Sequence, residues 1–307
     1  MQEGKVVSLD EGTGRLTPSR TLTAGLQQAV EAHEALTISD PSQSMDQMSF
    51  QAFFRHFRRL AGTTGTAREA RFEFWLIYRL GVVSVPTHRP RIRTQARPQV
   101  FGTQAEKDQA VIAEIERLHG QGLPVLVGLR SVRSSDRLAE QLRVLALPFG
   151  LINAVRLADE AEVVAQAGKA GRITVATNMA GRGTDIVHGP GVAARGGLQV
   201  IMAECNESSR IDRQLAGRCG RQGDPGRVST WLSADDPLLK RHLPALWCTI
   251  IERLAAHPSP WAGLLLKRAG PAAVWAAQRF AEAQSRHRRR LVLESDEWMD
   301  KALPFGD

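Results

Sequence analysis

The sequence lacks the features of a secreted or disulfide-stapled protein. It has three cysteines in 307 residues, and they stand far apart without C-x-x-C spacing. Free thiols in a reducing compartment fit that pattern better than disulfides or a zinc site. The first ten residues, MQEGKVVSLD, contain no apolar signal core. We therefore expect a cytoplasmic protein.

Long apolar runs are also missing. The most apolar late stretch, WAGLLLKRAGPAAVWAA at 261–277, is interrupted by Lys267, Arg268 and Pro271. A helix that spans a bilayer needs about 20 apolar residues. This stretch is too interrupted to cross a membrane, although a position against a membrane surface stays open.

The usual phosphate-binding loop is the third absence. The pattern G-x-x-x-x-G-K-[ST] occurs nowhere, because Gly4-Lys5 is followed by valine and Gly168-Lys169 by alanine. The hydroxyl that would bind magnesium is missing in both places. In VVSLDEG a strand pattern ends in an Asp-Glu pair of the kind that holds magnesium in motor proteins. That assignment needs a phosphate loop upstream, and only a few residues precede the run. No Ser-His-Asp or Cys-His arrangement stands out, and the histidines show no metal-ligand spacing.

Positive charge is what the chain has in excess. Its formal net charge is +8 and its pI is near 10.1. Such a balance indicates polyanionic partners: nucleic acid, an anionic membrane surface or phosphate-bearing ligands. The length predicts about two domains.

The first part of the chain, residues 1–85, is expected to hold a short strand and two helices. The strand is KVVSL, and the first helix, 22–36, repeats Leu22, Leu26, Ala29 and Val30 at helical spacing. The second helix, 48–62, carries an aromatic stripe that predicts core packing, made of Phe50, Phe53, Phe54 and Phe57. A Pro-rich, basic connector at 82–98 marks a domain boundary.

The middle part, residues 86–240, alternates between helical and strand patterns. This alternation predicts an α/β fold with a parallel sheet covered by helices. From 241 to 307 the chain is expected to be helical, with a basic run, SRHRRR, followed by an acidic one. The helices are predicted at 106–122, 134–147 and 208–224, and the strands at 124–129, 173–177 and 198–204.

A Gly-rich turn follows the strand at 173–177. In TNMAGRGTDI, Gly181 and Gly183 permit close approach of a phosphate or ribose, Arg182 can reach a phosphate, and Asp185 can accept from a ribose hydroxyl. Turns that follow strands of open α/β sheets are where nucleotides bind. Ile186 stands where a dinucleotide fingerprint needs its third glycine. The alternative for Asp185 is a helix N-cap.

A second motif, QLAGRCGRQGDPG, contains Arg218 and Arg221. On a helix, residues three apart project from one face, and two guanidinium groups held there can stabilise charge on a transferring γ-phosphoryl group. With Gln214 and Gly217 they form Q-x-x-G-R-x-x-R, the sixth motif of superfamily-two helicase-type motors. The alternative is a basic, solvated helix face.

A third small-residue turn, LAGTTGTA at 60–67, has two interpretations. It either couples nucleotide state to a domain interface or ends a helix. The spacing alone does not separate the two.

Taken together, these motifs resemble the SecA family, the ATP-driven motors of bacterial protein translocation. VVSLDEGTGRL, LAGTTGTA, GLPVLVGLRSVRSSDRLAEQL, TVATNMAGRGTDI and SSRIDRQLAGRCGRQGDPG follow the family's order. The resemblance implies a RecA-like fold of the P-loop NTPase superfamily, helicase type. It assigns 1–85 to the end of a first nucleotide domain, 86–240 to a second nucleotide domain and 241–307 to the start of a helical scaffold.

In that family ATP lies between the two RecA-like domains. By resemblance, the turn with Gly181, Arg182, Gly183 and Asp185 contacts nucleotide. Arg221 is the arginine finger with Arg218 beside it, and Gln222 senses the γ-phosphate. The phosphate loop and the metal-binding acid belong to a part of SecA that this chain does not contain, so Mg²⁺ is expected only where a partner chain supplies its ligands.

The resemblance therefore predicts half of a translocation motor. The implied partners are a SecA-type N-terminal half that carries the phosphate loop, the SecY channel, preprotein and anionic phospholipid at the inner face of the cell membrane. We do not expect the chain to hydrolyse ATP alone. The alternatives are a non-catalytic remnant or adaptor and a helicase-type nucleic-acid motor fragment. The latter is disfavoured because no stacking-aromatic module is evident.

Overall fold

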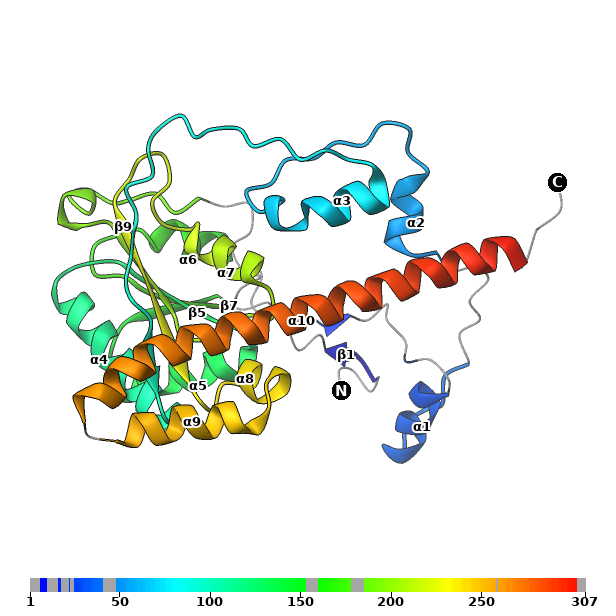
Figure 1. Ribbon diagram of the computed structural model, residues 1–307. Helices are drawn as coiled ribbons and strands as arrows, with labels where there is room; N and C mark the ends of the chain where they lie inside the picture. The colour runs from blue at the N-terminus through cyan, green and yellow to red at the C-terminus, as the bar shows by residue number, and fades with distance from the viewer. Residues whose placement is uncertain are drawn as a thin grey trace.

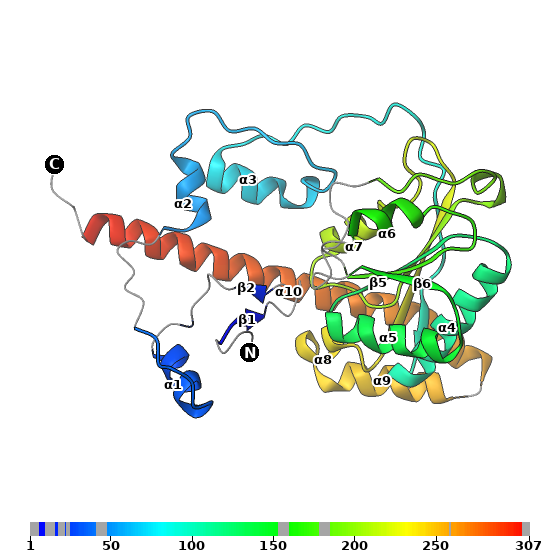
Figure 2. The same ribbon diagram turned by 180° about the vertical axis from the view of Figure 1, so that it is seen from behind.

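The computed structural model describes residues 6–9, 16–17, 22, 25–40, 48–152, 160–177, 185–257 and 259–302. A sheet with helices on both faces forms the larger part of the molecule. A long helix, α10 (Pro260–Ala302), passes along it and continues beyond it (Figure 1). Two N-terminal helices, α2 (Phe50–Arg55) and α3 (Arg71–Tyr78), lie beside the far half of α10 in both views (Figures 1 and 2).

The sheet has seven strands in the order β3-β9-β8-β5-β7-β6, with β4 also paired to β9. Every pairing in it is parallel. The chain first builds β6 and β7 to one side of β5 and then β8 and β9 to the other. The strands are β3 (Thr94–Gln95), β4 (Gln99–Phe101), β5 (Val125–Leu129), β6 (Phe149–Ile152), β7 (Ile173–Thr177), β8 (Leu198–Met202) and β9 (Gly226–Ser233). The predicted α/β class with a parallel, helix-covered sheet is confirmed.

The three central strands are buried along their whole length. All five residues of β5, of β7 and of β8 are buried, as expected for parallel strands covered on both faces. One apolar cluster packs under α4 (Gln104–Gly120) and α5 (Val132–Val144), and a second under α6 (Glu160–Gln166) and α7 (Ser209–Ala216). These two layers hold the strand ends in fixed positions.

Two of the three helices predicted in this region, 106–122 and 134–147, are confirmed as α4 and α5, and their starts have clear causes. Thr103 and Glu106 form a capping box at the start of α4, which satisfies two backbone N–H groups that the helix leaves unpaired. Ser131 accepts from the backbone N–H of Ser134 at the start of α5. Strands β3, β4, β6 and β9 were not predicted.

A third apolar cluster joins the C-terminal helices to the sheet. It lies between β9 and the helices α8 (Pro237–His242), α9 (Ala245–Ala256) and α10. The prediction that the chain is helical beyond 241 is confirmed. No helix in the described part of the chain is both long and apolar enough to cross a membrane.

The N-terminal part differs from the prediction. Its remaining elements are β1 (Ser8–Leu9), β2 (Leu16–Thr17), α1 (Leu26–His33) and a 3-10 turn, η1 (Arg68–Ala70). The face of α1 that is buried carries Gln27 and Glu31, whereas Leu26 is 54% exposed. Gln27 donates to Glu31, and the backbone N–H of Ser39 donates to the same carboxylate. A polar network has therefore replaced the apolar face that the spacing predicted.

The aromatic stripe of α2 is not in the core, so that prediction was wrong. Phe50 is 81% exposed, and Phe53, Phe54 and Phe57 are 40–51% exposed. Instead the rings contact one another, with the Phe53 centroid 5.4 Å from that of Phe54 and 5.3 Å from that of Phe57. No described element covers their outer faces.

The predicted helix at 208–224 is much shorter than expected. α7 ends at Ala216, and Gly217 caps it. Gly220, Gln222 and Gly223 have φ values of 68°, 53° and 81°, in a region that a right-handed helix does not use. Arg218 and Arg221 therefore lie in a turn after the helix and not on one helical face.

Candidate functional site

An open cavity of about 560 Å³ lies at the carboxyl ends of β6 and β7. Ile152 and Thr177 are its last residues on these two strands, and the turn after α7 forms another wall with Arg218 and Arg221. A cavity of this size, at this edge of a parallel sheet, is where α/β proteins bind small ligands. The motif that we singled out for its arginines thus lines a cavity.

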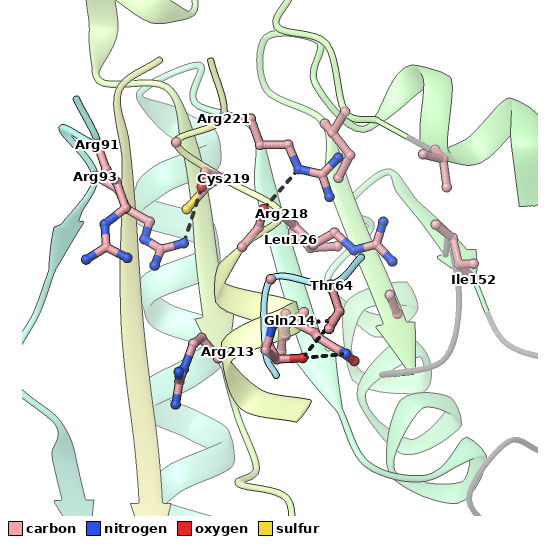
Figure 3. A pocket seen from close by; sticks show the side chains of 18 of the residues that line it. Thr64, Arg91, Arg93, Leu126, Ile152, Arg213, Gln214, Arg218, Cys219 and Arg221 are labelled. Atoms are coloured by element: carbon pink, nitrogen blue, oxygen red, sulfur yellow. Dashed lines mark hydrogen bonds between the residues drawn. The ribbon is translucent and has the colours of Figure 1, made fainter. Parts of the chain in front are cut away.

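Arg221 is held by two contacts in this cavity. Its Nε donates to the carbonyl of Gly217 over 2.9 Å, and its Nη1 lies 2.7 Å from Asp185 Oδ1. Figure 3 shows the guanidinium groups of Arg218 and Arg221 on the same side of the turn. The helical spacing that we used to predict this was wrong, but the turn brings both groups to one side.

The Arg221–Asp185 pair is only partly shielded from water. The two side chains are 37% and 51% exposed, and a pair at that exposure contributes about 0–1 kcal/mol. Such a pair can be exchanged for a stronger anion at little cost. Asp185 also accepts from the neighbouring N–H of Ile186, and it does not cap a helix, because no helix begins beside it among the described residues.

The turn is fixed in place by the basic connector, which sequence reasoning had treated only as a domain boundary. Arg93 donates to the carbonyls of Ala216 and Cys219, and Arg89 donates to the carbonyl of Gln222 over 3.3 Å. Arg93 thus satisfies the carbonyl of Ala216, the last residue of α7, which the helix itself leaves unpaired, and both arginines hold carbonyls of the turn that follows. A Cβ on Gly220 would lie 2.6 Å from Arg93 Cβ, so the contact requires glycine there.

The connector arginines were missed because only their charge was considered. No local pattern in RPRIR reveals their role, because the carbonyls that these arginines satisfy lie 123 to 133 positions further along the chain. Arg91 and Arg93 both line the cavity, and their positions are seen to one side of it in Figure 3.

The turn LAGTTGTA reaches the same cavity from the N-terminal part. Thr64, Gly65 and Thr66 line it, and Gln214 donates to Thr66 Oγ1 over 3.3 Å. The interpretation as a helix end is wrong, because α2 already ends at Arg55. The first residue of Q-x-x-G-R-x-x-R therefore contacts this loop, while its arginines face the cavity.

One buried polar group in the wall has no partner. Thr177 is 1% exposed, and its hydroxyl makes no hydrogen bond in the described part of the chain. A buried hydroxyl left unpaired is costly, so its position at the cavity suits a polar ligand. Together with the arginines it gives the wall the chemistry of an anion site.

The other predicted residues are not all brought together. Gly181, Arg182 and Gly183 lie outside the described residues. Gln222 is exposed and is not part of the cavity wall. The described residues contain no cluster of three or more His, Cys, Asp or Glu that fits a metal ion. Of the predicted residues that the structure describes, Arg218 and Arg221 thus line the cavity, and Asp185 pairs with Arg221.

Each cysteine is buried and free. Burial raises the pKa of Cys219 to about 11 and raises the pKa of Cys205 and Cys248 as well. Cys219 lies in the cavity wall, but a thiol with a raised pKa is a poor nucleophile. It serves as a packing residue under the turn.

Comparison with known proteins gives a consistent family. The model described as SecA P-loop domain matches residues 90–192 and 189–257, and the one described as SecA DEAD-like domain matches 7–75. The first covers more than half of the chain. Neither changes the observation that G-x-x-x-x-G-K-[ST] is absent from these 307 residues.

Individual relatives align over the full chain. The chain is 52% identical over 305 residues to protein translocase subunit SecA 2 of Magnetococcus marinus, covering 99% of this chain and 46% of that protein. It is 46% identical over 309 residues to the same-named subunit of Bordetella avium, covering 100% and 46%. The chain thus spans about half the length of these relatives.

A solved structure is also similar. The structure of the E. coli DEAD-box protein SrmB bound to regulator of ribonuclease activity A aligns with a TM-score of 0.40 and 20% identity. It covers 49% of this chain and 82% of that one. On the family models and the full-length alignments, the chain belongs to the SecA family.

Proposed function

We propose that the cavity supplies the second half of an ATP site, in which Arg218 and Arg221 stabilise the negative charge of the transferring phosphoryl group. The observation that carries the proposal is the exposed pair of Arg221 with Asp185 at the carboxyl ends of β6 and β7. The pair holds the guanidinium in the cavity before nucleotide arrives. A phosphate, with more charge and more acceptor oxygens, then competes with the carboxylate.

Each residue has a defined part in this proposal. Arg221 moves its Nη1 donor from Asp185 to a γ-phosphate oxygen, and Arg218 adds a second cation on the same side. Asp185, once released, accepts from a ribose hydroxyl. Preorganised guanidinium groups of this kind stabilise charge that develops in the transition state. Hydrolysis in this scheme transfers the γ-phosphoryl group to water.

The phosphate loop and the magnesium ligands come from outside these 307 residues. Since the SecA relatives are about twice as long, we propose that a SecA-type segment carrying the loop closes the site over the cavity. Because these relatives are named protein translocase subunits, we propose that the work is ATP-driven protein export, with the SecY channel, preprotein and anionic phospholipid as partners. The net charge of +8 favours anionic surfaces.

The test is ATP turnover by the chain alone and in a mixture with the part of the Magnetococcus marinus relative that it does not cover. We expect turnover in the mixture and a loss of roughly 10³-fold for Arg221→Ala, within the range measured for arginine fingers. Arg227→Ala is the matched control, because Arg227 is an exposed arginine close in sequence that does not line the cavity.

The outcomes separate the alternatives. Equal turnover with Arg221→Ala and Arg227→Ala would remove the arginine-finger role. Nucleotide binding that leaves turnover absent in every mixture would support a remnant or adaptor. Turnover that rises several-fold with added nucleic acid would support the helicase-type alternative.

A further inference from the structure

Helix α7, which leads into Arg218 and Arg221, begins against α10. The carboxylate of Glu282 accepts from the backbone N–H and the hydroxyl of Ser209, both over 3.0 Å, and from the Ser208 hydroxyl over 3.3 Å. Ser208 stands at the N-cap but makes no side-chain cap bond to its own helix. A residue of α10 thus supplies the anionic cap that helix starts favour.

Gln278, one turn before Glu282 in α10, makes a second contact with α7. Gln278 Nε2 donates to Asp212 Oδ2 over 2.7 Å and to the carbonyl of Asn206 over 2.9 Å. Asp212 Oδ1 accepts from the backbone and side-chain amides of Asn206. Burial raises the pKa of Asp212, while the bonds from Asn206 and Gln278 oppose that rise. Loss of Gln278 would leave a buried carboxylate short of a donor, which is costly.

The N-terminal part also contacts α7. Arg213 pairs with Glu69 in η1. The next element, α3, returns to α10 through Glu73, whose two oxygens accept from Arg289 over 2.6 and 2.9 Å. In both views α7 lies between α3 and α10 (Figures 1 and 2). Polar contacts therefore link α7 to α10 directly and also through η1 and α3.

Helix α7 is short and packs closely on the sheet. It has eight residues, and a Cβ on Gly128 of β5 would meet Leu215 Cδ2 at 2.1 Å. Leu215 therefore packs closely on β5, with α10 against the first residues of α7 and Arg218 beyond its last. We expect a displacement of one end of so short a helix to move the other.

We propose that Gln278 and Glu282 of α10 are positioning residues for Arg218 and Arg221, so that the placement of α10 regulates the ATP site. This inference rests on the proposed function for its consequence in turnover. Neither residue lines the cavity, so each acts through α7 and through Asn206 or Ser208, which lie just before it in the chain. A shift of α10, caused by a partner or by a change of nucleotide state, would then change the positions of Arg218 and Arg221.

The test uses Glu282→Ala and Gln278→Ala in the full chain, with two controls on the same helix. Gln284→Ala changes an exposed glutamine, and Glu294→Gln changes a carboxylate that pairs only within α10, with Arg290. We measure kcat and KM for ATP in the mixture with the phosphate-loop half. Amide hydrogen exchange of residues 209–222 in the chain alone is the second readout.

We expect each test variant to lower kcat roughly tenfold, within the range by which residues that touch neither ligand change coupling. Amide exchange across 209–222 should accelerate in both, and both controls should match the parent. Glu282→Gln keeps an acceptor oxygen and should restore most of kcat. A simple loss of stability would lower the melting temperature but would not single out kcat well below that temperature.

Two results would overturn the proposal. One is unchanged kcat in Glu282→Ala and Gln278→Ala at a temperature where both are folded. The other is unchanged amide exchange at 217–222 in the chain alone. The second result does not depend on ATP, so it separates failure of this inference from failure of the proposed function, which Arg221→Ala tests.

Discussion

The sheet domain and the N-terminal part of the chain are built in opposite ways. The three apolar clusters lie within the sheet and its helices, with Ile173 and Ile201 fully buried. Among the described residues before the connector, the buried side chains are Gln27, Glu31 and Thr66, all polar. The first region contains its own core, whereas the described residues of the second form none.

The difference shows how the two regions are held. The N-terminal part exposes Phe50 by 81% and Phe72 by 74%, and apolar surface of this kind marks a contact site for another segment. Its links to α10 include exposed ion pairs such as Arg55 with Glu297, each worth about 0–1 kcal/mol, and a hydrogen bond from the Ser49 N–H to Asp296 Oδ2. We therefore expect contacts with another segment to fix the position of the N-terminal part. This part matches the SecA DEAD-like domain over residues 7–75.

The largest effect is expected at a buried ion pair in the sheet domain. Lys107 is fully buried and pairs with Asp236, which also accepts from the N–H of Ser233. Lys107→Ala leaves a buried carboxylate unpaired, at a cost of about 3–5 kcal/mol. Urea unfolding measures it. The exposed counterpart, Arg55→Ala, should cost about 0–1 kcal/mol, and equal losses would remove the contrast.

The next effect concerns two isoleucines. Ile201→Ala in β8 creates a cavity in the first apolar cluster and should cost about 2–5 kcal/mol. Ile38 is 59% exposed in the N-terminal part, so Ile38→Ala should stay within about 0.5 kcal/mol. The comparison is made by denaturant midpoint. A costly Ile38→Ala would show that the N-terminal part has a core of its own.

A smaller effect on stability, but a specific one on association, is expected on α3. Phe72→Ser should change the unfolding free energy of the chain by less than about 0.5 kcal/mol, since the ring is 74% exposed. It should weaken association with the phosphate-loop half, because it removes apolar area from the contact. Titration calorimetry tests this, with exposed Val144 on α5 changed to Ser as the control. Equal affinities for the two variants would contradict a contact at α3.

An effect that is absent at neutral pH is the pH dependence of stability from Cys219. Its folded pKa is raised from 9.0 to about 11 by burial, so between those values the folded protein keeps a proton that the unfolded chain has lost. Stability from this group is constant below about pH 9 and falls as pH rises toward 11. Urea unfolding at pH 8 and pH 10 should show the decline, and Cys219→Ala should reduce it. Rapid reaction of the native protein with a thiol reagent at pH 7.5 would contradict burial.

Much of the sheet domain was predictable because its strands are covered on both faces. Short runs rich in apolar and β-branched residues, such as 173–177 and 198–202, have few other interpretations. The spacing of Arg218 and Arg221 predicts a longer helix, whereas α7 ends at Ala216, before Gly217 and Gly220. Glycines so placed favour a helix end and a left-handed turn.

Other features depended on partners that sequence spacing does not reveal. The stripe at Phe50 and Phe53 does repeat at helical spacing, but burial requires a second surface, and the described residues supply none. The pairing of Arg221 with Asp185 joins residues 36 positions apart, and only the family resemblance placed both at one nucleotide. Arg93 was missed because carbonyl capping across the chain leaves no local pattern.

The most direct measurement is photo-crosslinking of an ATP analogue with an aryl azide on its γ-phosphate to the mixture with the phosphate-loop half. The analogue places its reactive group where we put Arg218 and Arg221. We predict labelled peptides from 213–222 of this chain, with the label competed by ATP and reduced in Arg221→Ala. Labelling confined to the other half, or to parts of this chain away from the cavity, would contradict the account.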